Sequence, residues 1–527
     1  YDKGSPERAE LTKALKKLHQ SSPVKIPFKI GGQVANNNTT SKQPNPSQHS
    51  EIVAEYASAT PENVQASIDA ALKAKADWEA TPFEDRAAIF LRACDLITGK
   101  YRAEIVAATM LGQGKNIREA EIDAAVESVD FFRQYIKECT EMFAQQPKLH
   151  EKSSWNRMEY RPLEGFVYAV SPFNFTALGA TLVGPAALLG NVVVWKPSDS
   201  ALHANHLFYK ILLEAGLPPN VVQFVPGDAE TVTDAVMSRP EFGALTFIGS
   251  TAVFKNLIGK IGQGTAEGRF NSYPRIIGES GGKNFHLIHG SANVKSAALD
   301  TLRSAFEYQG QKCSAVSRVY VAESVWPEFK KVIQEETKNI KVGPPDDYAS
   351  FVNAVIHERA FDRLDDVIQK AKNDPELELI AGGETSKSKG YFIHPTIFRT
   401  TNPNHDIMKR ELFGPLFAVH VYPDSEYSSI LKTIDKSKYA LTGSVFAKDI
   451  KAAREAQNVL KHTAGNFYIN TKSTGSIVGQ QPFGGSRDSG SNDKTGTIGL
   501  ISRYCSIRTI KEEFGSTEEL QYPSNEV

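Results

Sequence analysis

Cysteine is scarce in this chain, and the few cysteines are far apart. The 527 residues contain four of them, Cys94, Cys139, Cys313 and Cys505, with no CxxC pair and no Cys/His cluster. This spacing argues against a disulfide scaffold and against structural zinc, and it suits a reducing compartment. We therefore expect no metal site.

An excess of charge of either sign is also missing. Sixty basic residues face sixty-one acidic ones, which gives a net charge of −1. Without a basic excess, nucleic acid and anionic membranes are poor candidate partners, and a small molecule is the better expectation. Hydrophobic residues at 41% and charged residues at 23% fit a folded globular protein. The length predicts two or three domains.

An uninterrupted apolar run of the kind that spans a membrane is absent as well. Residues 165–195 carry no charge and are long enough to cross a bilayer. However, Pro172, Asn174, Pro185 and Asn191 interrupt the run, and β-branched stretches flank it. We predict a buried β-α-β unit here.

The remaining pattern alternates between strands and helices. Thr60 and Pro61 open a helical region that extends to about residue 143. Strand-like segments follow in two series, which predicts two α/β domains with parallel sheets. The segments are "FVYAV", "NVVVW", "VVQFV", "ALTFI" and "RII", then "KNFHLIH", "SRVYVA", "GPLFAVHVY", "TGSVFA" and "NFYIN". The Asn/Ser/Thr/Pro-rich stretch at 36–50 is expected to be a surface loop.

Polar residues follow the predicted strands at points where such sheets bind ligands. Asn174 follows the first strand, Lys196 ends the second, and Gly249 and Ser250 lead from the fourth into a helix. A helix entry of this kind favours a pyrophosphate, and a lysine can bind ribose hydroxyls. The usual GxGxxG fingerprint is missing. Each feature alone also occurs in loops that bind nothing.

Two further segments carry reactive side chains. Cys313 lies in "GQKCSA", and Glu279 lies in "GESGGK". Taken alone, Cys313 is more often a small buried hydrophobe, and Glu279 a strand-end cap or ion-pair partner. A thiol can also act as a nucleophile and a carboxylate as a base. The Gly/Ser-rich loop 473–490 is either filler or a binding loop.

Seven segments in one order resemble the aldehyde dehydrogenase superfamily over roughly residues 50–515. They are "SPFNF", "WKPS", "FIGS", "GESGGK", "GQKCSA", "ELFGP" and "QPFGG". Within it, "LRSAFEYQGQKCSA" and "STGSIVGQQPFGG" are most similar to the branch that oxidises L-glutamate γ-semialdehyde to glutamate in proline catabolism. The resemblance implies an α/β fold with a Rossmann-like NAD-binding domain, a second α/β catalytic domain and a small β oligomerisation arm. It also implies NAD as the cofactor.

The resemblance assigns roles to individual residues. Cys313 attacks the aldehyde, Asn174 and the backbone N–H of Cys313 hold the oxyanion, and Glu279 activates the water that cleaves the thioester. The cofactor residues carried over are Ser171, Pro172, Phe173, Lys196, Ser198, Gly249, Ser250, Thr251, Glu411 and Phe413. The substrate residues carried over are Ser314, Gly475 and Ser476 for the carboxylate, with Phe175 and Phe483 as apolar walls.

The resemblance also implies organisation and location. The NAD-binding domain is expected at 1–148 and 170–284, the catalytic domain at 285–472, the substrate loop at 473–489, and the oligomerisation strands and arm at 149–169 and 490–527. A homodimer in the mitochondrial matrix is expected. The chain begins at Tyr1, so we expect that a leader is absent from it.

Some alternatives stay open at this point. Ser280 stands where the family usually has leucine, and no residue in "KPSDS" corresponds to the family glutamate that rejects NADP. The substrate could be another carboxylated semialdehyde, such as succinate semialdehyde. Other classes are a cysteine hydrolase, which needs a histidine base that no motif supplies, or an inactive binding protein.

Overall fold

A five-stranded parallel sheet forms the centre of the first lobe. The computed structural model describes residues 1–35 and 39–526. The strand order is β11-β10-β7-β8-β9, and all pairs are parallel. The bounds are β7 (Phe166–Val170), β8 (Val192–Lys196), β9 (Val222–Phe224), β10 (Phe242–Ile248) and β11 (Arg275–Glu279). The chain runs outward from β7 in both directions, so the switch point of the sheet lies between β7 and β10.

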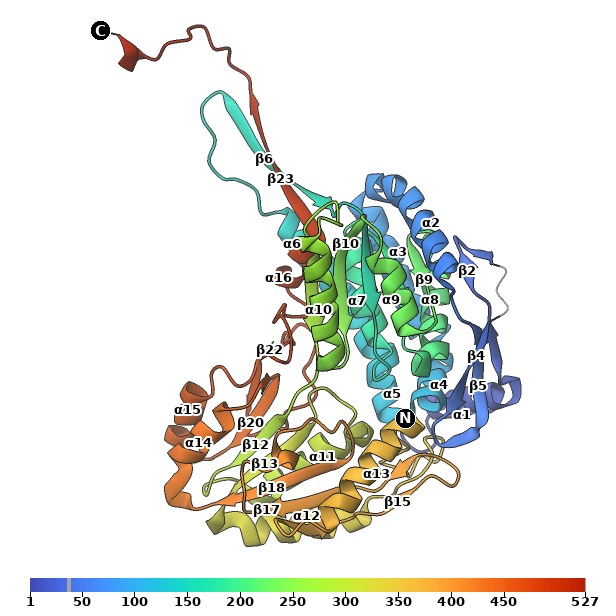
Figure 1. The fold of residues 1–527 in the computed structure, drawn as a ribbon, viewed down its shortest axis with the longest axis vertical. Helices are drawn as coiled ribbons and strands as arrows, with labels where there is room; N and C mark the ends of the chain where they lie inside the picture. Colours follow the sequence, from blue (N-terminus) through green and yellow to red (C-terminus); the bar gives the residue numbers. More distant parts are fainter. Residues whose placement is uncertain (36–38, 527) are drawn as a thin grey trace.

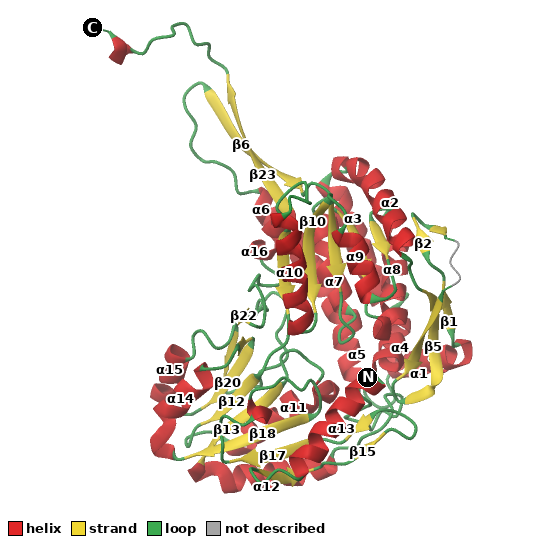
Figure 2. Cartoon of the chain, viewed as in Figure 1, coloured by secondary structure: helices red, strands yellow, loops and turns green. Residues whose placement is uncertain are grey.

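Helices cover both faces of this sheet (Figure 2). They are α2 (Pro61–Ala80), α3 (Phe83–Thr98), α4 (Arg102–Gln113), α6 (Ser128–Phe143), α7 (Ala177–Leu188), α8 (Leu202–Ala215), α9 (Ala229–Met237) and α10 (Thr251–Ala266). Alternate strand residues enter different cores: Val167 and Val193 pack with one helix layer, and Tyr168 and Val194 with the other. Burial on both faces explains the uncharged run, and the predicted β-α-β unit is confirmed. Thr60 caps α2 as predicted.

A seven-stranded sheet forms the second lobe, in the order β14-β17-β18-β13-β12-β20-β21. Only the edge strand β14 runs antiparallel within it. The strands are β12 (Asn284–Ile288), β13 (Val316–Ala322), β14 (Leu377–Ala381), β17 (Thr396–Thr400), β18 (Leu416–Tyr422), β20 (Thr442–Phe446) and β21 (Asn466–Ile469). The helices are α11 (Val294–Phe306), α12 (Trp326–Asn339), α13 (Glu358–Lys372), α14 (Tyr427–Asp435) and α15 (Ile450–Val459). The predicted second α/β domain is therefore present (Figure 1).

The N-terminal region contains more structure than expected. Helix α1 (Pro6–Ser21) precedes a three-stranded sheet of β1 (Val24–Ile26), β4 (Thr40–Asn45) and β5 (Gln48–Ala57). Of the stretch expected to be a loop, residues 36–38 lie outside the described residues, and most of the rest forms β4 and β5. The loop prediction is wrong there because β4 pairs with the longer β5, which compensates for its polar side chains. A short hairpin of β2 (Lys29–Ile30) and β3 (Gln33–Val34) lies beside it.

A two-stranded arm projects from the first lobe (Figure 1). It consists of β6 (Ser154–Pro162) and β23 (Cys505–Glu513), paired antiparallel along their full length. Two expected boundaries need correction. Strand β7 is a central strand of the sheet, so the first arm segment ends before it, not at residue 169. Helix α16 (Ile498–Ile501) packs into the core of the first lobe through Leu500 and Ile501, so the second segment begins at β23, not at residue 490.

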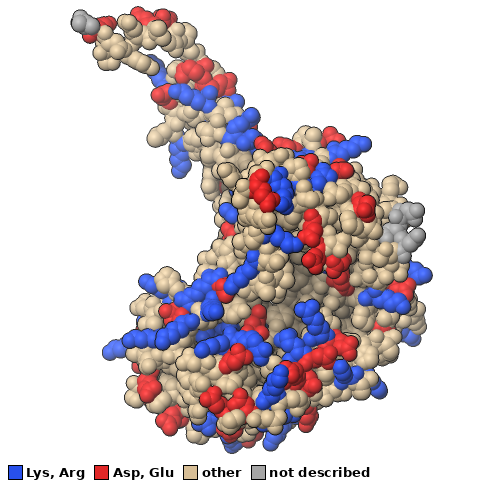
Figure 3. All heavy atoms as spheres, in the orientation of Figure 1, with Lys and Arg blue, Asp and Glu red and all other residues tan. Residues whose placement is uncertain are grey.

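The surface of the molecule carries both signs of charge. Figure 3 shows Lys and Arg intermixed with Asp and Glu over the visible face of both lobes. Among the described residues, no helix combines the length and apolar character that a membrane crossing needs.

Candidate active site

The thiol of Cys313 and the carboxylate of Glu279 meet between the two lobes. Glu279 ends β11 of the first sheet, and Cys313 lies in the turn that precedes β13 of the second. The Cys313 S–H donates to Glu279 Oε1 at 3.6 Å. A sulfur nucleophile thus has a carboxylate base within reach.

An unusual turn presents Cys313 to this space. Tyr308 and Gln309 have φ angles of 52° and 55°, and Gly310 follows at 66°. Left-handed backbone at two non-glycine residues is strained, and buried contacts hold it. The Tyr308 hydroxyl donates to the carbonyl of Gln113 at 3.0 Å, and Gln309 Nε2 donates to that of Gly114 at 2.7 Å.

Burial shifts the proton affinities of both groups. It raises the pKa of Glu279 to about 7, against smaller opposing effects of the Cys313 hydrogen bond and the charge of Lys494. Burial also raises the pKa of the Cys313 thiol well above its usual value, and the nearby Glu279 charge adds to this. The thiol is therefore protonated, and Glu279 is poised near neutrality as a proton acceptor.

Asn174 lies in the loop after β7 and contacts the segment that carries Cys313. It is buried, and its Nδ2 donates to the carbonyl of Gln311 at 3.1 Å. An amide nitrogen carries two hydrogens, so one N–H remains for a further acceptor. The backbone beside Cys313 is fixed by Asn284, whose Nδ2 donates to the carbonyls of Cys313 and Ala315 at 2.7 and 2.8 Å.

A buried ion pair supports the Asn174 loop. Asp123 and Lys115 are both completely buried and lie 2.8 Å apart. The Asp123 carboxylate also accepts the backbone N–H groups of Thr176 and Ala177 at 2.9 and 2.8 Å. These N–H groups belong to the first turn of α7, where a negative charge is favourable. The Lys115 ammonium lies 3.8 Å from the centre of the Phe175 ring.

A cavity of about 440 Å³ opens in front of Cys313 and Glu279. Its wall includes all five residues expected to contact the substrate, which are Phe175, Ser314, Gly475, Ser476 and Phe483. The structure thus brings these residues together with the thiol, although their contacts with a substrate stay a prediction. Gly475 has a φ of +82°, a conformation that favours glycine at this point of the loop.

The cavity wall also contains charged residues that the sequence did not single out. Glu127 lies on it, and burial together with the charge of Asp123 raises its pKa. Arg118 lines the cavity too, whereas Lys312 is neutralised by Glu119 at 2.6 Å and Glu307 at 3.0 Å. No sequence motif predicts that these residues line the cavity. Among the described residues, no group of three or more His, Cys, Asp or Glu side chains is placed to hold a metal ion.

The expected cofactor residues gather at the carboxyl edge of the first sheet. Ser171 follows β7, Lys196 ends β8 with Ser198 just beyond, and Ser250 caps α10 by accepting the N–H of Val253. Lys196 is buried and lies 3.6 Å from Asp199. At Gly249, a Cβ would lie 2.6 Å from the Phe247 ring, so the bare backbone keeps the helix entry open.

Two of these side chains make contacts within the protein. The Ser171 hydroxyl accepts the indole N–H of Trp195 at 2.9 Å. The Thr251 hydroxyl donates to Ser280 Oγ at 3.2 Å and to the Asp488 carbonyl at 3.3 Å. These two hydroxyls therefore help to fix the strand and helix ends at which they lie.

The second lobe adds Glu411 and Phe413 to the same edge. Glu411 Oε1 accepts the N–H of Gly282 at 2.8 Å, and burial raises the pKa of this carboxyl to about 7. Phe413 has a φ of 51°, and its ring meets the Phe173 ring edge-on at 5.9 Å; Pro172 precedes that residue. This arrangement fits a dinucleotide. The helix entry suits its pyrophosphate, the buried lysine and carboxylate suit its riboses, and the aromatic pair suits a ring.

Comparisons with known proteins agree with this geometry. The chain is 55% identical to a mitochondrial delta-1-pyrroline-5-carboxylate dehydrogenase of Emericella nidulans, over 100% of this chain and 92% of the relative. It is 48% identical to a protein of the same name from Bos taurus, over 99% and 92%. A crystal structure of delta-pyrroline-5-carboxylate dehydrogenase from Mycobacterium tuberculosis bound with NAD has a TM-score of 0.95 at 42% identity, covering 99% of this chain and 96% of that one. Residues 34–510 match the model of the aldehyde dehydrogenase family, and the chain belongs to this family.

Proposed function

We propose that this chain is an NAD-dependent dehydrogenase that oxidises L-glutamate γ-semialdehyde, the open form of Δ1-pyrroline-5-carboxylate, to L-glutamate. The observation that carries the proposal is the half-buried Cys313 thiol, 3.6 Å from Glu279, at the wall of a cavity of about 440 Å³. This reaction is the second step of proline catabolism. The names of the relatives support the substrate, and the NAD-bound structure of the Mycobacterium tuberculosis protein supports the cofactor.

The first step is attack of Cys313 on the aldehyde carbon. Glu279 takes the thiol proton, the sulfur adds to the carbonyl, and a thiohemiacetal forms. The remaining Asn174 N–H and the Cys313 backbone N–H stabilise the oxyanion. One such donor contributes about 2.7–4 kcal/mol in a comparable acyl-transfer site. NAD, when bound, supplies the acceptor for the hydride that leaves the substrate carbon.

The second step is hydrolysis of the thioester on Cys313. A carboxylate with a pKa of about 7 is well matched to deprotonate water near neutral pH. Glu279 first releases the thiol proton to solvent. It then acts as the base and takes a proton from water as the hydroxide adds to the thioester, and it returns this proton to the thiolate that leaves when the carbon–sulfur bond breaks.

The cavity wall also suits the two charged ends of this substrate. Hydroxyl and backbone N–H donors at Ser314, Gly475 and Ser476 bind the α-carboxylate. Glu127 faces the same cavity and binds the α-ammonium, whose positive charge stabilises the ionised carboxyl. Succinate semialdehyde has no ammonium, so this carboxylate favours the amino acid substrate over it.

We further propose a homodimer joined through the arm. The arm exposes large apolar side chains, with Trp155 at 49%, Ile507 at 52% and Phe514 at 69% exposure. A two-stranded ribbon with unpaired edges is a poor isolated element and a good dimerisation element. The mitochondrial matrix is the proposed location, because the relatives from Emericella nidulans and Bos taurus are named as mitochondrial.

Steady-state formation of NADH with three aldehydes tests the substrate. The highest kcat/KM is expected for glutamate γ-semialdehyde, above succinate semialdehyde and propanal. Glu127→Gln should reduce kcat/KM for the first substrate about tenfold or more and change the other two little, because it removes one charge-assisted contact. Equal or better turnover of succinate semialdehyde would refute the substrate assignment while leaving the chemistry of Cys313 in place.

A further inference from the structure

A second large cavity lies in the first lobe, away from the active site. It has a volume of about 870 Å³ and lies between α1, α4, α8 and the first N-terminal strands. None of its lining residues belongs to the catalytic, cofactor or substrate sets described above. Helices α4 and α8 pack on one face of the five-stranded sheet, whereas α10, at the expected cofactor site, packs on the other.

The lining of this N-terminal cleft is strongly basic. Two carboxylates, Glu10 and Glu104, line it. Seven lysines line it as well, which are Lys13, Lys16, Lys17, Lys25, Lys29, Lys100 and Lys210. Within the described part of the chain only Lys100 among them has an ion-pair partner, Glu214 at 2.7 Å. So many unneutralised ammonium groups around one cavity repel one another and attract an anion, although the chain as a whole has a net charge of −1.

A buried imidazole also lies at the wall of the cleft. His203 lines the cavity and is only 6% exposed, yet its Nδ1 has no hydrogen-bond partner among the described residues. Burial, followed by the charges of His203, Lys210 and Lys29, lowers the pKa of the neighbouring His206 to about 3. The two lysines therefore act on the same part of the cleft.

We propose that the N-terminal cleft is a binding site for a small soluble molecule that carries two or more phosphate groups. The lysines neutralise the phosphates and donate charge-assisted hydrogen bonds to them. Leu18, Val24, Pro27 and Leu207 form an apolar part of the wall for the organic part of the molecule. The volume is in the range of pockets for such ligands, which is about 300–1,000 Å³.

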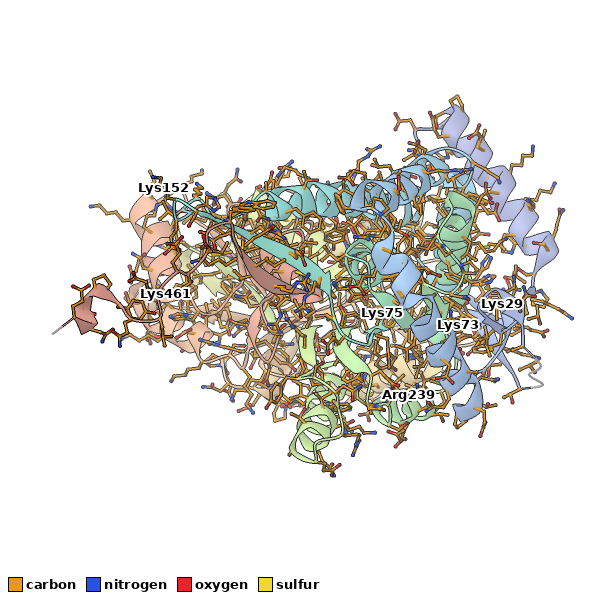
Figure 4. The ribbon with its side chains drawn as sticks, turned by 90° about the horizontal axis from the view of Figure 1, so that it is seen from above. Lys29, Lys73, Lys75, Lys152, Arg239 and Lys461 are labelled. Atoms are coloured by element: carbon orange, nitrogen blue, oxygen red, sulfur yellow. The ribbon has the colours of Figure 1, made fainter. Side chains whose placement is uncertain are left out.

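Isothermal titration with inorganic triphosphate tests the proposal. The full enzyme is saturated with NAD beforehand, so that the cofactor site cannot bind the probe. The test variant is Lys29→Gln/Lys210→Gln. The matched control is Lys73→Gln/Lys75→Gln, which removes the same charge from α2, outside the cleft (Figure 4).

Triphosphate should bind the wild-type enzyme, and the cleft variant should bind it about tenfold more weakly or worse, since two close attractive charges are lost. The α2 control should change affinity less than about twofold, because its lysines lie outside the site. Dehydrogenase activity without the probe should be the same in all three proteins, which shows that they are folded. Absence of binding at millimolar probe, or equal weakening in both variants, would overturn the proposal.

A phosphate on a lipid headgroup is a second ligand that the same lysines can bind. Sedimentation with phosphatidylglycerol vesicles separates the two sources. We expect little co-sedimentation, and full displacement of any bound protein by triphosphate. Vesicle binding that triphosphate cannot displace would overturn the assignment to a soluble ligand.

Discussion

Replacing Asp123 by asparagine should damage both stability and turnover, although Asp123 does not line the substrate cavity. The carboxylate forms a fully buried ion pair with Lys115 and accepts two N–H groups at the start of α7. Asparagine has nearly the same shape but no charge, and its single oxygen cannot reproduce all three contacts. The Lys115 ammonium is then left buried without a counter-charge.

The size of the effect follows from this burial. Removing one partner of a buried pair costs about 3–5 kcal/mol. Burial already lowers the pKa of Lys115 against the opposing charge of Asp123, so the lysine should lose its proton in the variant and part of the cost will be relieved. We therefore expect destabilisation of about 3 kcal/mol, the lower end of that range.

Turnover should fall because the same N–H groups fix the loop that carries Asn174. An oxyanion donor accounts for about 10²–10³ in kcat, and a displaced loop should lose a part of this, about tenfold or more. Asp366→Asn is the matched control. Asp366 pairs with Lys370 at 2.7 Å, but both side chains are exposed, so this substitution should be nearly neutral.

Thermal denaturation and pre-steady-state kinetics measure the two effects. The double variant Lys115→Met/Asp123→Asn should recover part of the stability lost in Asp123→Asn, since no buried charge remains. A loss no larger than in Asp366→Asn would refute the role of the buried pair. Lower stability with unchanged kcat would refute the link from Asp123 to Asn174.

Three further changes test the remaining assignments. Cys313→Ala should abolish oxidation and leave NAD binding nearly intact, because the cofactor residues lie on other loops; a residual rate above about one per cent would exclude the nucleophilic role. Glu279→Gln should slow thioester hydrolysis more than NADH formation, so a burst of NADH should persist in stopped flow. In the wild type, the steady-state rate should fall as the pH drops through about 7, where Glu279 becomes protonated, and the variant should lack this limb. Ile507→Glu should shift the dimer toward monomer in sedimentation velocity, since it charges an exposed apolar side chain of the arm; an unchanged mass would place the interface elsewhere.

The motif residues could be predicted because each lies at a strand end that local pattern reveals. Runs such as residues 166–170 and 242–248 are apolar and β-branched or aromatic, and polar residues directly after them mark the binding edge of a parallel sheet. The order in which the motif segments follow one another along the chain then identifies the family. Such a pattern does not show how distant segments pack on one another, and the boundary error at residue 490 has this origin. The boundary at residue 169 disagrees with the strand that the same pattern predicts at 166–170.

The contacts that hold the site were not predictable for the same reason. Lys115 and Asp123 lie in a helical region whose sequence suggests an exposed polar face, and nothing local indicates that both are completely buried. A π-helical turn at Glu121–Glu127 changes the register there, and both Asp123 and Glu127 lie within it. Similarly, β4 forms from a loop-like sequence because β5 offers it a partner.

Cys313 and Glu279 are half-buried and titrate together. At 3.6 Å, two negative charges would repel strongly in a site with little water, so the thiolate and the carboxylate cannot both be present easily. Moving the thiol proton to Glu279 forms one anion and removes another, which avoids this repulsion. The two groups therefore titrate as a coupled pair that shares one proton, and a single ionisation near neutral pH belongs to the pair. Desolvation raises the thiol pKa most, and the Glu279 charge adds to it. The raised pKa is compatible with a reactive Cys313, because Glu279 is also the group that takes its proton.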